Sequence, residues 1–123
     1  MPNDSRQPLY YGIYRLDNVY GQVTPSLAAE ITALWCENQV LDGAEAQRRT
    51  GEVVLTIRDT AGTLVGVNTV YVNDFIKAGN PYYFYRVFIR PRDRRFHGLA
   101  SFAAKSTRLF LRSYQPAGHP KPQ

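Results

Sequence analysis

The chain has 123 residues, of which 44% are hydrophobic and 20% are charged, a composition typical of one folded domain. Its single cysteine, Cys36, excludes an internal disulfide framework and a cysteine-based zinc site, and we expect no metal. No apolar run approaches the roughly 18 residues of a membrane span, and the polar start MPNDSRQ does not resemble a signal peptide. We therefore expect a cytoplasmic protein without membrane contact, with one domain over 1–113 and a flexible proline-rich tail over 114–123.

The net charge of +5 is distributed unevenly along the chain. Residues 86–112 contain eight Lys and Arg and one acid, Asp93, so this segment carries +7 and the rest carries −2. Such asymmetry indicates an anionic ligand or partner, which is a phosphate group, a nucleic acid or an acidic protein. Charge by itself does not distinguish among these three.

The first half of the chain predicts one strand followed by two helices. Residues 8–17 are rich in tyrosine and β-prone, as a first strand would be. Thr24 before Pro25 is a typical helix start, because the hydroxyl can cap the helix and proline fits its first turn. Apolar residues then recur with helical spacing to about Asn38, and a second short helix is expected within 42–51.

The second half changes to the period of β-structure. Strands over 52–59 and 64–72, joined by a turn, predict an antiparallel hairpin. Residues 81–91 are almost continuously apolar, as in a central strand with both faces covered. A last helix is expected over 99–113. The order β-α-α-β-β-β-α predicts an α+β fold.

Residues 87–100, VFIRPRDRRFHGLA, lead from a strand through a basic turn into a helix. The first N–H groups of a helix are unpaired, and its dipole favours negative charge there. Gly98 allows the backbone to approach a phosphate closely, and Ala100 does so nearly as well. Arg94 and Arg95 add charge-assisted contacts. A solvated basic turn without a ligand is the alternative interpretation.

The hexapeptide RFHGLA, Arg95 to Ala100, fits the pattern [Q/R]-x-x-G-x-[G/A] and resembles the acyl-CoA pyrophosphate loop of the GNAT N-acyltransferase superfamily. The preceding VFIRP resembles the strand that leads into this loop, and the sequence pattern from Asp59 to Gly66 resembles a hairpin of the family. The resemblance covers about residues 9–113. It implies a GNAT-like, mixed, mostly antiparallel sheet with flanking helices, of which this chain lacks the C-terminal strands.

The resemblance implies that the chain binds acetyl-CoA or another acyl-CoA and, if it is active, transfers the acyl group to an amine. The pyrophosphate would lie on the loop and the helix start, and the backbone of 87–89 would face the pantetheine arm and polarise the acyl carbonyl. The cofactor-binding residues implied are Val87, Phe88, Ile89, Arg94, Arg95, Phe96, His97, Gly98, Leu99 and Ala100. A bulky residue at Gly98 is then expected to abolish acyl-CoA binding.

The catalytic residues are not identified by the sequence. No carboxylate lies in strand 82–90 to act as a general base, so Tyr83, Tyr85 and His97 are weak candidates for a proton relay. We expect weak or absent transferase activity from the lone chain.

The same strand supports two other functions. Without a following strand, 82–90 would lie at an uncovered, aromatic sheet edge, and we expect a homodimer or a dedicated protein partner there. A non-catalytic protein-interaction module, such as an inhibitor or assembly subunit, is therefore the alternative function. Nucleic-acid binding is the third, with aromatic side chains stacking on bases and Arg92, Arg94 and Arg95 contacting phosphates.

Four tyrosines in the first strand region remain open to two interpretations. They fit a substrate groove and half-buried strand packing equally well, and they are Tyr10, Tyr11, Tyr14 and Tyr20. Glu52, Asp59 and Asp74 flank strands, and we expect turn or edge residues there rather than catalytic bases.

Overall fold

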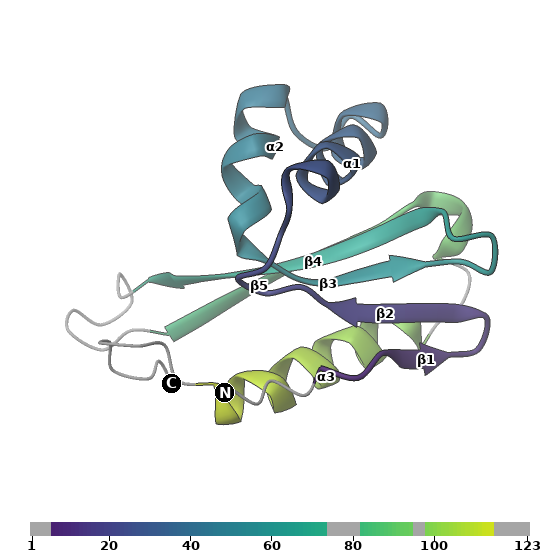
Figure 1. Cartoon of the computed structure of the whole chain (residues 1–123), viewed down its shortest axis with the longest axis vertical. Coiled ribbons are helices and arrows are strands. Elements are labelled where there is room, and N and C mark those ends of the chain that lie inside the picture. The colour runs from purple at the N-terminus through teal and green to yellow at the C-terminus, as the bar shows by residue number, and fades with distance from the viewer. Residues whose placement is uncertain (1–5, 74–81, 95–97, 115–123) are drawn as a thin grey trace.

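The computed structural model is a single sheet with helices on both of its faces (Figure 1). It describes residues 6–73, 82–94 and 98–114. The strands are β1 (Leu9–Tyr11), β2 (Tyr14–Asn18), β3 (Val53–Arg58), β4 (Leu64–Asn73) and β5 (Tyr82–Ile89). The helices are α1 (Pro25–Glu37), α2 (Gly43–Arg49) and α3 (Leu99–Ser113), and short 3₁₀ turns cover Thr50–Glu52 and Pro91–Asp93.

The five strands lie side by side in chain order, β1-β2-β3-β4-β5, and every neighbouring pair is antiparallel. The predicted α+β class is therefore confirmed. The expected mixed sheet is not found among the described strands, because each connection returns the chain in the opposite direction. The connection from β2 to β3 contains both α1 and α2, whereas short turns join β1 to β2 and β3 to β4.

The predicted first strand is two strands rather than one. Gly12 has a φ of +60°, and Tyr11 pairs with Tyr14 across a two-residue turn. Glycine with positive φ at the first turn position is typical of a tight hairpin turn, which the continuous run of β-prone residues concealed. The prediction of one strand was wrong because it gave the β-propensity of the flanking residues more weight than the turn signal of Gly12.

The three helices begin and end close to the predicted positions for local reasons. The Thr24 hydroxyl accepts from the Leu27 N–H at 3.2 Å, and the Asp42 carboxylate accepts from the Glu45 N–H at 2.9 Å. Helix α3 buries one stripe against the sheet, formed by Leu99, Ala103, Thr107 and Leu111. Within the described residues, no helix combines the length and the apolar character that crossing a membrane requires.

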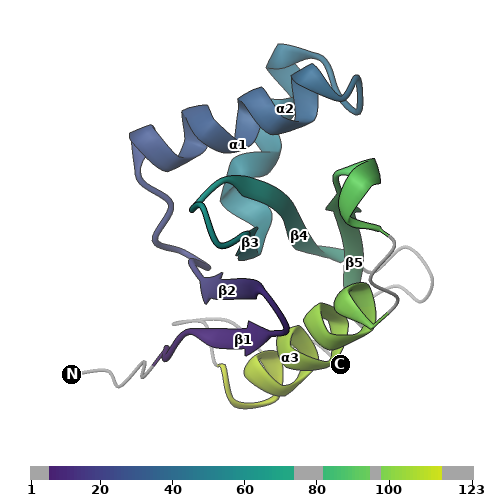
Figure 2. The ribbon, with the colours of Figure 1, turned by 90° about the vertical axis from the view of Figure 1, so that its right-hand side faces the viewer.

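Two hydrophobic cores lie on opposite faces of the sheet, as Figure 2 shows with α1 and α2 on one side and α3 on the other. The core beneath α1 and α2 includes Ile31, Leu34, Trp35, Ala46, Val53, Leu64 and Val67. The core beneath α3 includes Tyr14, Leu16, Leu55, Ile57, Val70, Ile89, Leu99, Ala103 and Leu111. Strands β3, β4 and β5 contribute side chains to both cores.

Strand β5 lies at the end of the sheet, so the expectation that it is central was wrong. All eight of its residues pair with β4, from Tyr82 opposite Asn73 to Ile89 opposite Gly66. Its two apolar faces arise because it lies between the helical layers, with Phe88 packed on the α1–α2 core and Ile89 buried in the α3 core. No other strand among the described residues pairs with its outer side, in agreement with the edge position expected for 82–90.

Candidate anion-binding site at the start of α3

The first turn of α3 has no side-chain cap, unlike the first turns of α1 and α2. Its first helical bond runs from the Phe102 N–H to the Gly98 carbonyl at 2.8 Å. The N–H groups of Leu99, Ala100 and Ser101 therefore have no acceptor within the helix. No acid lies in this first turn, and the surrounding segment 86–112 carries +7. Donors without an acceptor in their own helix, together with positive charge, suit an anion.

A buried acid fixes the turn that leads from β5 toward this helix. Asp93 is only 6% exposed, and its carboxylate accepts from the Tyr14 hydroxyl at 2.5 Å and from Arg90 Nε at 2.7 Å. Burial alone would raise the pKa of Asp93, but these two hydrogen bonds outweigh it and hold the pKa below the usual 3.8. In the sequence, Asp93 is recognisable only as one negative charge in a basic segment. Its partner Tyr14 lies 79 residues away, so no local pattern could reveal the contact.

Gly98 is required by a contact within the chain. A Cβ at this position would overlap the hydroxyl of Tyr11 and lie 2.7 Å from its ring carbon Cζ. The Tyr11 ring also packs on Phe102, with ring centroids 5.1 Å apart. A bulky residue at Gly98 would therefore displace Tyr11 whether or not a phosphate binds. The expected use of that substitution as a test of acyl-CoA binding does not hold.

The backbone of β5 alternates between its partner strand and the outer edge. The Arg90 N–H donates to the Val65 carbonyl at 2.8 Å, so the alternation of an antiparallel ladder turns the amide groups of Phe88 toward β4 and those of Val87 and Ile89 outward. The Ile89 carbonyl accepts from Arg94 Nε at 2.6 Å. Of the three residues expected to face a pantetheine arm, only Val87 has an outward amide and carbonyl that no described residue contacts in this way.

The Tyr85 hydroxyl is held by a buried amide that sequence analysis did not single out. Asn68 is fully buried in β4, and its Nδ2 donates to the Tyr85 oxygen at 3.2 Å and to the Thr107 hydroxyl at 2.7 Å. Its Oδ1 accepts from the Leu55 N–H at 2.8 Å. Burial raises the pKa of Tyr85, although the Asn68 hydrogen bond acts in the other direction. The phenol is therefore protonated at neutral pH, and its oxygen accepts the hydrogen bond from Asn68.

The remaining predicted residues divide into those that the structure places and those outside its described part. Burial raises the pKa of Tyr83 as well. The Leu99 side chain is fully buried, so only the backbone amide of Leu99 can contact a ligand. Asp59 accepts from the Ala61 and Thr63 N–H groups, each at 3.0 Å, and is a turn residue as expected. The sites predicted at Arg95, Phe96, His97 and Asp74 lie outside the described residues.

The tyrosines of the first strand region have different environments. Tyr14 is buried, Tyr11 packs on α3, and Tyr20 packs edge-on against Phe110 and Tyr114, with centroids 6.0 and 5.4 Å apart. For these three, the packing interpretation is confirmed. Tyr10 differs, because it is 65% exposed and lines a groove.

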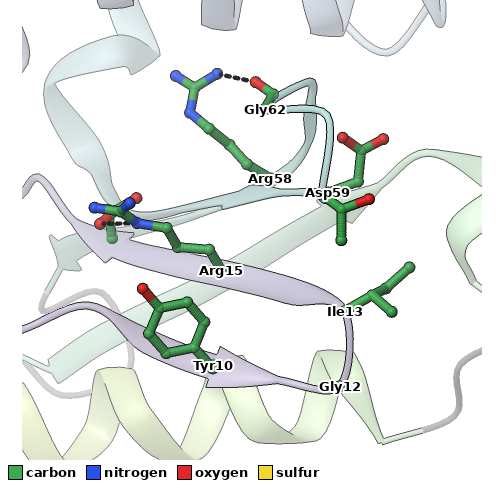
Figure 3. A pocket seen from close by; sticks show the side chains of 9 residues that line it. Tyr10, Gly12, Ile13, Arg15, Arg58, Asp59 and Gly62 are labelled. Atoms are coloured by element: carbon green, nitrogen blue, oxygen red, sulfur yellow. Dashed lines mark hydrogen bonds and ion pairs between the residues drawn. The ribbon is translucent and has the colours of Figure 1, made fainter.

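That groove has a volume of about 640 Å³ and lies between the β1–β2 and β3–β4 turns, on the sheet face away from α3 (Figure 3). Its two arginines are already paired, Arg15 with Asp17 at 3.1 Å and Arg58 with Glu30 at 2.6 Å. Two acids and two arginines line it, so it selects neither an anion nor a cation. The lining residues are Tyr10, Gly12, Ile13, Arg15, Asp17, Arg58, Asp59, Thr60 and Gly62.

Comparisons with protein-family models and with curated proteins identified no relative of this chain. No protein-family model matches the chain, and no curated protein shows significant sequence similarity to it.

Proposed function

We propose that the chain binds an acyl-CoA, with its pyrophosphate at the start of α3 and its acyl arm along the outer side of β5. The observation that carries this proposal is the uncapped first turn of α3 within a segment of charge +7, while α1 and α2 are each capped by a side chain. The GNAT resemblance of Arg95 to Ala100 supports the same ligand, and the antiparallel strands between the helical layers are compatible with it.

If the bound acyl-CoA reacts, the proposed chemistry is direct transfer to an amine. The amine nitrogen attacks the thioester carbonyl, the C–S bond breaks, and the departing thiolate takes a proton. Tyr85 is the proposed donor of that proton, because its phenol is neutral and Asn68 already occupies its oxygen as a donor. The ammonium formed on the acceptor loses its proton to water, and the Tyr85 phenolate takes a proton back from water, so the proton count balances. Without a carboxylate in β5, we propose weak activity from the chain alone.

The test is titration with acetyl-CoA, followed by calorimetry and by the amide NMR signals of the three helix starts. We expect binding that shifts the Leu99, Ala100 and Ser101 signals and leaves those of the capped α2 start, near Glu45, unchanged. Acetyl-pantetheine lacks the pyrophosphate, and it should bind at least about tenfold more weakly, since charge-assisted hydrogen bonds contribute roughly 1.5–3 kcal/mol each. Absence of binding at millimolar acetyl-CoA would refute the proposal.

A second candidate function is protein interaction at the outer side of β5, as a homodimer or with a dedicated partner. The specific observation is an eight-residue edge strand with exposed apolar side chains, Tyr85 at 37% and Val87 at 40%. Long apolar edge strands are usually covered or paired in native proteins, because their free N–H and C=O groups invite another strand. Hydrogen exchange of the β5 amides, with and without a partner, tests this function.

A further inference from the structure

The outer edge of β5 is a row of backbone groups directed away from the sheet. The ladder with β4 uses the amides of every second residue, beginning from the Arg90 N–H bond to Val65. The N–H and C=O groups of Tyr83, Tyr85 and Val87 therefore point outward. They are spaced two residues apart, which is the repeat of an added strand. A partner that satisfies them must present an extended backbone.

The two faces beside this edge differ in chemistry. On the α3 side, Tyr85 and Val87 are exposed, and neighbouring Val72 in β4 is 47% exposed. On the α1–α2 side, the Arg86 guanidinium lies 4.4 Å over the Tyr71 ring, and its nearest acid, Glu52, is 3.9 Å away. The edge is therefore apolar on one face and cationic on the other.

The second cation on that face is Arg94. Its guanidinium lies 5.4 Å over the ring of Phe88. Phe88 is two residues after Arg86 in β5, so both side chains lie on the same face of the strand. Arg94 is exposed and forms no ion pair with an acid among the described residues. Two arginines therefore lie on the side of α1 and α2, Arg86 over the Tyr71 ring and Arg94 over the Phe88 ring.

We propose that β5 accepts an extended partner segment as a sixth strand, and that apolar and acidic residues alternate in this segment. Its apolar residues would contact Tyr85 and Val87, and its acids would face Arg86 and Arg94. Side chains of a strand alternate between faces, so one pattern meets both requirements. This inference rests on the second candidate function, protein interaction at β5, and does not require acyl-CoA binding.

Charge and backbone chemistry select this partner over two others. A second copy of the chain would present the same strand, YYFYRVFI, which has one arginine and no acid to pair with Arg86, and two chains of charge +5 repel. A nucleic acid would supply negative charge to the arginines, but it has no strand ladder to pair with the outward groups of Tyr83, Tyr85 and Val87. An acidic extended peptide satisfies both the charges and the backbone.

The probe is an acetylated, amidated octapeptide in which glutamate alternates with valine and threonine, titrated into the full chain and followed by calorimetry and amide hydrogen exchange. We expect binding with slowed exchange at the outward amides of Tyr83, Tyr85 and Val87. The Phe84 and Arg86 amides, which face β4, should exchange as before. A peptide of the same composition with its glutamates grouped together should bind at least about tenfold more weakly, because its side chains cannot satisfy both faces.

Backbone methylation of the peptide tests strand addition directly. One version carries N-methyl groups at the odd positions and another at the even positions. Only the residues that pair with β5 need their N–H groups, so one version should lose binding at least about tenfold and the other should retain it. A shift by one residue cannot rescue the weak version, since it would exchange the apolar and acidic faces.

Arg86→Gln should weaken the alternating peptide several-fold and reduce the salt dependence of its binding, since it removes one charge pair at the rim. Arg15→Gln is the matched control, an exposed strand arginine near the opposite edge, and it should have no effect. Equal binding of both methylated peptides, or of the grouped peptide, would overturn the proposed partner while leaving a binding surface at β5. Protection of the β5 amides by self-association without peptide would also overturn it, in favour of a second copy.

Binding of an oligothymidylate that depends on Arg86, without peptide binding, would overturn the proposal in favour of nucleic acid. If no probe protects the outward amides and the chain stays monomeric by light scattering, protein interaction at β5 fails altogether.

Discussion

The candidate site, with the turn over Pro91–Asp93, and the outer edge of β5 are built in opposite ways. In the first region, Tyr11 lies against Gly98 at the start of α3, and the Tyr14 hydroxyl donates a hydrogen bond to buried Asp93 in the turn. At the outer edge of β5, one hydrogen bond from Asn68 holds the Tyr85 hydroxyl, and the backbone groups beyond it face outward. Both regions belong to the same strand-turn-helix segment of the sequence.

Rigidity and binding capacity therefore lie in different parts of this segment. Buried polar groups at the start of α3 are already paired with each other, so substitution there leaves a partner unsatisfied and is costly. No described strand pairs with the outer edge of β5, so its outward backbone groups are the ones that we propose for binding another molecule. We therefore expect the two regions to respond to substitution with very different losses of stability, measured by urea unfolding with the fluorescence of the single tryptophan, Trp35.

The largest effect is expected for Asp93→Ala. It leaves the Tyr14 hydroxyl and the Arg90 guanidinium without their buried acceptor, and we expect a loss of about 3 kcal/mol in the free energy of unfolding. Asp17→Ala is the control, because it removes a carboxylate from a more exposed pair with Arg15 and should cost less than about 1 kcal/mol. Equal losses in the two variants would show that the Asp93 cluster does not stabilise the turn.

Gly98→Ala should cost about 1–3 kcal/mol, because the new Cβ displaces Tyr11 from its packing on Phe102. In a Tyr11→Ala background the same change should be neutral or slightly stabilising, since the backbone of Gly98 has an ordinary negative φ of −85°. Gly43→Ala is the control, a first-turn helix glycine with open space around its Cβ position, and no loss is expected there. A loss that persists without the Tyr11 ring would contradict the contact.

The pH dependence of stability should also report on the start of α3. Hydrogen bonds hold the pKa of Asp93 in the folded chain below 3.8, so its contribution is complete above that pH and is lost as the pH falls through the folded value. Unfolding free energy should therefore decrease below about pH 4, and by less in Asp93→Asn than in the wild type. Hydrogen bonds from Arg48 and Arg49 lower the pKa of Glu45 to about 2, but these ion pairs lie at the surface, where solvent screens them, so Glu45→Gln is a control expected to change this slope little. An unchanged slope in Asp93→Asn would assign the effect to other acids.

The smallest effect is expected at the edge of β5. Tyr85→Phe removes one of the two acceptors of Asn68 Nδ2 and leaves the Thr107 hydroxyl in place, so the loss should be below about 1 kcal/mol. Tyr10→Phe, at an exposed tyrosine near the other edge, should have no effect. A loss at Tyr85 as large as that at Asp93 would contradict the contrast between the two regions.

Much of the fold was predictable because its causes are local. Thr24 and Asp42 cap their helices by accepting from an N–H group three residues later in the chain. The apolar stripe of α3 likewise follows from the spacing of residues within one helix. The exception is the split of the first strand at Gly12, where the signal was also local but was outweighed by the tyrosines around it. The basic segment that ends at α3 could likewise be read from charge alone.

The surroundings of that segment depend on tertiary packing. The class of fold, the three helices, the strands other than the split at Gly12 and the basic segment before α3 were all predictable from the residues alone. The sequence could not show that Tyr14 pairs with Asp93, that Tyr11 requires the glycine at 98, or that Asn68 lies between β3, β5 and α3. Capping and periodicity act between neighbours along the chain, whereas these contacts join residues many positions apart. Such contacts exist only once the packing of α3 on the sheet has brought the elements together.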